Sequence, residues 1–299
     1  MLTTGVDHIG VGVSDMDRST RFWAELGFTD VAFDYSGPLQ GLPGHDVDAR
    51  VVMLRPARPT VLGPAAVKLV QTSAPPPMPE GMAWGEPGVC EVCIHVKDQA
   101  RLYERLVANG HTGLMEPNES PLDPYGTMCS LSYVADPDGT KIELIEWLDL
   151  EQGWPEESGP QGVNHVAFGV ASLERTREFY RALGFTGMLF NSDGYFEPMD
   201  PWFAPRPAPR QKMTLLTNPF GGGLEPVEHD PPSPDKRGEW GHLGPFDFGV
   251  GVRNLDVAAG KVKLVAEPQT IELGGGATWR YAYFEEPDGT YVCLTEARY

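Results

Sequence analysis

The sequence contains an internal duplication. Residues 5–8 (GVDH) return as residues 162–165 (GVNH), and each copy is followed at the same spacing by an aromatic pair and a Leu-Gly-Phe triplet. Residues 136–140 (DPDGT) likewise return as residues 286–290 (EPDGT). Because a long internal duplication repeats a folding unit, the two halves of the chain are expected to share one architecture.

Length and charge narrow the class of protein. The 299 residues suit two domains of about 150 residues each. A formal net charge of −19 disfavours nucleic acid or an anionic membrane as a partner. The first repeat starts close to Met1, and no apolar run approaches the roughly 18 residues that a membrane span requires. We therefore expect a cytoplasmic protein whose four cysteines are reduced.

Each half divides again into two units. The β-branched segments at residues 6–13 and 89–96 indicate strands, and each is followed by an amphipathic helical pattern. Residues 128–135 and 140–147 indicate a hairpin around a turn rich in Asp, Pro and Gly. Repetition of this order predicts an α+β fold of four βαβββ modules. The expected domains are residues 1–150, with modules 1–75 and 84–150, and residues 160–299, with modules 160–220 and 240–299.

Two segments are predicted to be long loops. Residues 198–209 and 221–237 are rich in proline and glycine, which interrupt regular strands and helices. Such loops often cover a binding site.

These motifs resemble the vicinal oxygen chelate superfamily. The resemblance rests on His8 on the first strand, on Phe22-Trp23 with the following Leu-Gly-Phe triplet, and on the closing segment of residues 136–144. Members of that superfamily include glyoxalase I, methylmalonyl-CoA epimerase, extradiol dioxygenases and bleomycin-resistance proteins. The resemblance covers nearly the whole chain and implies two glyoxalase-like half-barrel domains.

The resemblance also implies where metal ligands would lie, namely on the first and last strands of the modules. The corresponding first-strand positions in this sequence are His8, Glu91, His165 and Asp247. The last-strand positions are Lys68, Glu143, Thr214 and Cys293. Two of them depart from the family pattern: Lys68 stands where glyoxalases have a carboxylate, and Glu91 stands where dioxygenases have a second histidine.

How the modules pair decides which candidates meet. If neighbouring modules pair, the first cavity holds a metal on His8, Glu91 and Glu143, and the second presents His165, Asp247 and Cys293 as a degenerate copy. If the second and third modules pair instead, Glu91 and Glu143 share a cavity with His165, and His8 is left with Asp247. A third alternative is that His8 packs at a strand end while both glutamates face solvent.

Other matched residues are weaker candidates. Glu146 and Glu296 lie three positions beyond ligand positions, so a strand is expected to turn them to the surface. Tyr133 and Tyr283 occupy equivalent positions and either reach the cavities or pack in the core. His95, four positions beyond Glu91, is expected on the same strand face, in the core or at a cavity rim.

The function implied by the resemblance is metal-dependent proton transfer. We expect one divalent ion per chain, Zn, Ni, Co or Mn, with Fe(II) as the second choice. The predicted activity is that of an epimerase, isomerase or lyase on a small hydroxy-carbonyl compound with vicinal oxygens, such as a sugar or cyclitol, through a metal-bound enediolate. Glu91 or Glu143 would act as the base, and Lys68 would polarise a substrate oxygen.

Two alternative functions remain open at this stage. One is an extradiol dioxygenase that uses Fe(II), and the other is a non-enzymatic small-molecule-binding resistance protein. A homodimer is an open possibility for the assembly.

Overall fold

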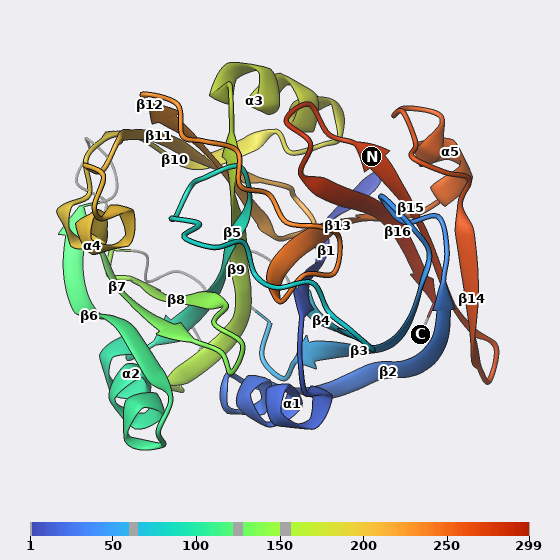
Figure 1. Ribbon diagram of the computed structural model, residues 1–299, viewed down its shortest axis with the longest axis horizontal. Helices are drawn as coiled ribbons and strands as arrows, with labels where there is room; N and C mark the ends of the chain where they lie inside the picture. Colours follow the sequence, from blue (N-terminus) through green and yellow to red (C-terminus); the bar gives the residue numbers. More distant parts are fainter. Residues whose placement is uncertain (1, 60–64, 122–127, 150–156, 299) are drawn as a thin grey trace.

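The protein consists of two curved eight-stranded sheets (Figure 1). The computed structural model describes residues 2–59, 65–121, 128–149 and 157–298. Sheet I has the strand order β14-β15-β16-β13-β1-β4-β3-β2, and sheet II has the order β10-β11-β12-β9-β5-β8-β7-β6. The predicted α+β fold with two half-barrels is confirmed. Within the described residues, no helix is long and apolar enough to cross a membrane.

The four modules have the following elements. The first comprises β1 (Thr3–Gly12), α1 (Met16–Glu25), β2 (Phe28–Leu39), β3 (Val47–Pro56) and β4 (Ala66–Thr72). The second comprises β5 (Gly88–Lys97), α2 (Gln99–Ala108), β6 (Thr112–Pro121), β7 (Met128–Ala135) and β8 (Lys141–Trp147). The third comprises β9 (Gly159–Val170), α3 (Leu173–Ala182), β10 (Gly187–Gly194), the 3₁₀ turn η1 (Glu197–Met199), α4 (Asp200–Phe203), β11 (Arg210–Thr217) and β12 (Gly223–Asp230). The fourth comprises β13 (Gly244–Val252), α5 (Leu255–Ala259), β14 (Gln269–Gly274), β15 (Ala277–Glu285) and β16 (Tyr291–Arg298).

The sheets correct the expected pairing of modules. Sheet I combines the first and fourth modules, the blue and red parts of Figure 1, through the antiparallel pair β1–β13. Sheet II combines the second and third modules through the antiparallel pair β5–β9. Residues 1–150 and 160–299 therefore do not form one sheet each. All four first strands carry similar apolar patterns, so local sequence does not select a partner, and packing between the sheets does.

Three apolar clusters follow from strand alternation. One contains the helices and the outer faces of both sheets, and the other two fill the concave faces of sheet I and sheet II. Ile9 and Val92 belong to the shared cluster, whereas their neighbours His8 and Glu91 are buried outside it. Since successive side chains of a strand face opposite sides, each ligand position is directed into a concave face.

A polar residue near the end of each module's last strand caps that module's helix. Glu146 accepts a hydrogen bond from the Gln99 backbone N–H at 3.0 Å. Equivalent bonds join Glu228 to Leu173, Glu296 to Leu255 and Gln71 to Met16. The prediction that Glu146 and Glu296 are solvated surface groups is therefore wrong. Glu296 is buried, Glu146 is half-buried, and both carboxylates accept hydrogen bonds from helix N-termini.

The repeated DPDGT and EPDGT turns connect the two sheets. Asp138, in the second module, accepts a hydrogen bond from the Ser14 backbone N–H at 2.9 Å at the start of the first module's helix. Asp288, in the fourth module, pairs with Arg175 of the third. Both carboxylates are largely buried. The most conspicuous repeat in the sequence thus holds together modules that belong to different sheets.

Asp138→Ala should therefore weaken the packing of α1 against sheet II. Loss of a hydrogen bond to a charged group costs roughly 1.5–3 kcal/mol of unfolding free energy, which urea denaturation would measure. The exposed Asp48→Ala serves as the control and should leave stability unchanged. Equal stability of the two variants would show that this contact does not hold the sheets together.

Candidate functional site

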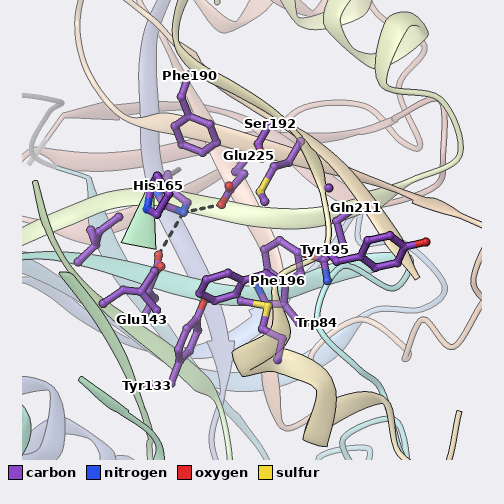
Figure 2. Close-up of a pocket in the computed structure, with 16 residues that line it drawn as sticks. Trp84, Tyr133, Glu143, His165, Phe190, Ser192, Tyr195, Phe196, Gln211 and Glu225 are labelled. Carbon is purple, nitrogen blue, oxygen red and sulfur yellow. Dashed lines mark ion pairs between the residues drawn. The ribbon is translucent and has the colours of Figure 1, made fainter. Parts of the chain in front are cut away.

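A pocket opens on the concave face of sheet II (Figure 2). Its enclosed space is about 80 Å³. Strands of both modules and the segment around η1 contribute its walls: Trp84, Pro121, Leu131, Tyr133, Glu143, Ile145, His165, Phe190, Ser192, Gly194, Tyr195, Phe196, Met199, Gln211, Met213 and Glu225.

Four buried ionisable side chains meet at the base of this pocket. They are Glu91 on β5, Glu143 on β8, His165 on β9 and Glu225 on β12, and none is more than 5% exposed. His165 Nε2 lies 2.7 Å from a carboxylate oxygen of Glu225 and 3.5 Å from one oxygen of each of the other two glutamates. In Figure 2 the side chains of Glu143 and Glu225 approach His165 from different sides.

Two carboxylate oxygens of this cluster lack hydrogen bonds. Glu91 Oε1 and Glu143 Oε2 are both buried without a hydrogen-bond partner. Such unsatisfied buried groups are costly unless a ligand or ion completes them. Three carboxylates and one imidazole nitrogen are the donors that divalent ions such as Zn, Mn or Ni accept. The donor atoms of Glu91, His165 and Glu225 lie within 4.8 Å of one another, and so do those of Cys93, Glu143 and His165, which fits a divalent cation held through His165.

The electrostatics of the cluster also favour a bound cation. Burial and the neighbouring Glu91 raise the pKa of Glu143 to about 8. Burial alone would lower the pKa of His165, but Glu225 and the other two glutamates raise it well above its usual value. An excess of negative charge in a dry site favours binding of a cation.

Two neighbouring side chains orient the cluster. The Trp84 indole N–H donates to Glu91 Oε2 at 2.6 Å, which leaves the other carboxylate oxygen directed into the cluster. Asn164 Oδ1 lies 2.8 Å from His165 Nδ1. Because that oxygen is an acceptor, Nδ1 carries a hydrogen, and Nε2 is the ring atom directed at the carboxylates. Outer partners of this kind commonly orient metal-ligating histidines.

Sheet I has the same four positions with different chemistry. Strand register makes His8 equivalent to His165 and Asp247 equivalent to Glu91, because Gly10 pairs with Asp247 as Ala167 pairs with Glu91. Ladder partners make Lys68 equivalent to Glu225 and Cys293 equivalent to Glu143. The two sites are therefore internal copies.

The sheet I copy does not fit a divalent metal. Lys68 Nζ lies 2.7 Å from Asp247 Oδ2, and the ammonium also donates to the Tyr283 hydroxyl at 3.3 Å. His8 Nδ1 lies 2.8 Å from Asp7, and His8 Nε2 lies 3.9 Å from Cys293 Sγ. Burial and the charge of Lys68 lower the pKa of His8. A buried ammonium at the centre of the site supplies the positive charge that a metal would otherwise bring.

The structure therefore groups the candidate ligands differently from the arrangement expected if neighbouring modules paired. His8 does not meet Glu91 or Glu143, because it lies in the other sheet, and Lys68 is likewise separated from both. His165 joins Glu91 and Glu143, as the swapped alternative requires. Asp247 and Cys293 lie with His8 and not with His165.

Glu225 was missed by sequence reasoning. The last-strand position of the third module was assigned to Thr214, which lies on β11 and donates to the Phe190 carbonyl. Residues 221–237 were expected to form a loop, but residues 223–230 form β12. Pro226 obscured this strand. The spacing from Glu225 to the helix-capping Glu228 matches that from Glu143 to Glu146, and this would have identified it.

Tyr133, Cys93 and His95 are also buried in sheet II. Tyr133 is buried in the pocket wall, and burial together with Glu143 raises the pKa of its hydroxyl well above the usual value. Cys93 lies beside Glu143 and His165 and is a possible additional donor. His95 is buried, and desolvation lowers its pKa to about 4.

Comparison with known proteins identifies the superfamily of residues 5–144 and the fold of the whole chain. Residues 5–144 match the sequence model of the family described as the Glyoxalase/Bleomycin resistance protein/Dioxygenase superfamily. No curated protein matches the sequence. Glyoxalase I from Zea mays shares the fold with a TM-score of 0.58 and 18% identity over 97% of this chain and 92% of its own. A putative dioxygenase from Bacillus subtilis gives a TM-score of 0.58 and 12% identity over 98% and 85%.

Proposed function

The chain belongs to the glyoxalase/bleomycin resistance protein/dioxygenase superfamily, and from this premise we propose that it is an enzyme that moves a proton at a carbon atom next to a carbonyl group. This membership confirms the resemblance to the vicinal oxygen chelates. The observation that carries the proposal is the cluster of three glutamates and one histidine at the base of the sheet II pocket.

We assign the binding of one divalent cation to Glu91, Glu143, His165 and Glu225. When bound, the cation would supply Lewis acidity toward two vicinal oxygens of the substrate. Glu91 is best suited to a fixed role, because it is fully buried and hydrogen-bonded to Trp84 and does not line the pocket.

Glu143 and Glu225 are suited to proton transfer because both line the pocket. In sheet II the order β12-β9-β5-β8 puts their strands on opposite sides of the central pair. One carboxylate can therefore accept the proton from a C–H bond beside the carbonyl, while the other donates a proton from the far side. Donation to the same carbon gives an epimer, and donation to the neighbouring carbon gives an isomer.

Loss of either carboxylate should separate the two half-reactions. With (R)- and (S)-1-hydroxy-1-phenylpropan-2-one in D₂O, the metal-loaded protein is expected to exchange the C–H proton of both enantiomers, measured by proton NMR. Glu143→Gln and Glu225→Gln should each lose about a hundredfold or more of exchange with one enantiomer and keep more with the other. Equal loss with both enantiomers, in variants that hold as much metal as the wild type, would contradict a two-carboxylate mechanism.

Trp84→Phe should weaken metal binding without removing a ligand. Outer-shell partners commonly contribute 10–100-fold to metal affinity, and Trp84 holds Glu91 through one hydrogen bond. Competition with a chromophoric chelator would measure the affinity. The equivalent Trp240→Phe, seven residues before Asp247, is the matched control and should leave it unchanged.

Two other functions predict different outcomes. A dioxygenase using Fe(II) would consume oxygen with a catechol, but such sites use two histidines and one carboxylate, whereas the sheet II cluster has one histidine. A non-enzymatic binding protein would bind ligands without proton exchange.

A further inference from the structure

Building on the proposed function of the same pocket, we propose that the substrate is electrically neutral with an apolar, ring-sized body. We further propose that Gln211 recognises a group at its far end that both donates and accepts hydrogen bonds, such as a carboxamide. This class differs from the sugar-like compound that the sequence suggested.

The wall of the pocket is mainly apolar, and part of it is aromatic. Trp84, Tyr133, Phe190, Tyr195 and Phe196 all line it. Tyr133 also packs edge-on against Trp202 with ring centroids 4.7 Å apart, which stiffens this wall. Aromatic faces favour contact with flat apolar groups, so this wall suits an apolar body better than a densely hydroxylated one.

The charges around the pocket disfavour an anionic substrate. Among the described residues that line it, none is a lysine or an arginine. The segments outside the described part of the chain also contain neither residue type. The nearby cations Arg210 and Lys212 are paired with Asp193 and Glu228. A carboxylate or phosphate on the substrate would therefore enter a site that holds three glutamates and, among the described residues, is lined by no lysine or arginine.

Gln211 provides the polar recognition element. It lies on β11, is 1% exposed and lines the pocket. Both its amide oxygen and its amide nitrogen are buried without a hydrogen-bond partner. Its backbone is fixed because β11 pairs with β10 on one side and β12 on the other. In Figure 2 it lies beside Tyr195, away from His165 and Glu143.

An amide with two unsatisfied atoms is suited to a ligand of matching chemistry. A buried donor and acceptor left unpaired carry the full cost of their desolvation, which a bound group removes when it forms both hydrogen bonds. A carboxamide, lactam or hydroxyl group can do this, whereas a methyl group cannot. The position of Gln211 across the pocket from the acidic cluster would then align the oxygenated end of the substrate with Glu143 and Glu225.

The test uses a matched series of 2-hydroxy-1-phenylethanones with a carboxamide, carboxylate, aminomethyl or methyl group at the para position. Isothermal titration of the metal-loaded and the metal-free protein would measure their affinities. We expect the carboxamide to bind about tenfold more tightly than the methyl compound, and the carboxylate to bind most weakly. Gln211→Leu should remove the carboxamide preference, while the control Gln40→Leu, an exposed position, should keep it.

A second variant distinguishes loss of recognition from loss of folding. Gln211→Glu keeps the size of the side chain and should transfer the preference to the aminomethyl compound by about tenfold. Tightest binding of the carboxylate would overturn the neutral substrate, and an unchanged carboxamide preference in Gln211→Leu would overturn the role of Gln211. If the preference holds in the metal-free protein but no compound exchanges its proton, the recognition stands and the proposed reaction fails.

Discussion

Purified protein is expected to contain close to one divalent metal ion per chain, and His165→Ala is expected to lose it while His8→Ala keeps it. His165 Nε2 is the one atom that contacts all three glutamates of the sheet II cluster. The equivalent His8 lies beside a buried ammonium, Lys68, whose charge opposes a cation. Plasma mass spectrometry of the wild type and both variants would measure the metal content.

The two histidine variants are a matched pair, because they change equivalent positions of the internal copies. Loss of metal in His8→Ala alone would locate the metal in sheet I and contradict the assignment. Zn, Ni, Co or Mn would support proton transfer, whereas iron would favour the dioxygenase alternative. Glu225→Gln is also expected to lower the metal content, and it tests the ligand that sequence reasoning missed.

Lys68→Met is expected to lower the unfolding free energy by about 3–5 kcal/mol, because it leaves Asp247 buried without its cation. Lys68 is 1% exposed and Asp247 is fully buried, with 2.7 Å between Nζ and Oδ2. The Lys68→Met/Asp247→Leu double variant should recover most of this loss, since no charge is then left unpaired. Urea denaturation of the single and double variants would measure the three values.

The exposed pair between Lys263 and Glu285 provides the control for that cycle. Lys263→Met should change stability little, because solvent screens an exposed ion pair. If the double variant is no more stable than Lys68→Met alone, the loss arises from packing of the lysine side chain and not from an unpaired Asp247. Metal content should stay at one ion in both variants, because neither change touches sheet II.

Local sequence patterns determined the modules and their faces. The repeated GVDH and GVNH segments, with the helices and hairpins after them, predicted the α+β fold, which is confirmed. The resemblance to the superfamily singled out Glu91 and Glu143 as ligand positions, and strand alternation directs their side chains to one face of the sheet. These features depend only on neighbours along the chain, so they can be read from the sequence.

The grouping of the candidate residues was decided by the tertiary structure. His8 and His165 head strands of nearly the same sequence, and their first-strand partners could be either of two modules. Only the packing between sheets I and II selects β5–β9 and β1–β13, and it therefore selects which histidine meets Glu91 and Glu143. Glu225 was not predicted for a related reason. Pro226 favours a loop in the sequence, and only the pairing of β12 with β9 and β11 shows that this segment is a strand. The sequence by itself determined four similar modules and the side chains that face inward, because both follow from local periodicity. The composition of each site was decided only by tertiary packing, because it depends on contacts between strands far apart in the chain.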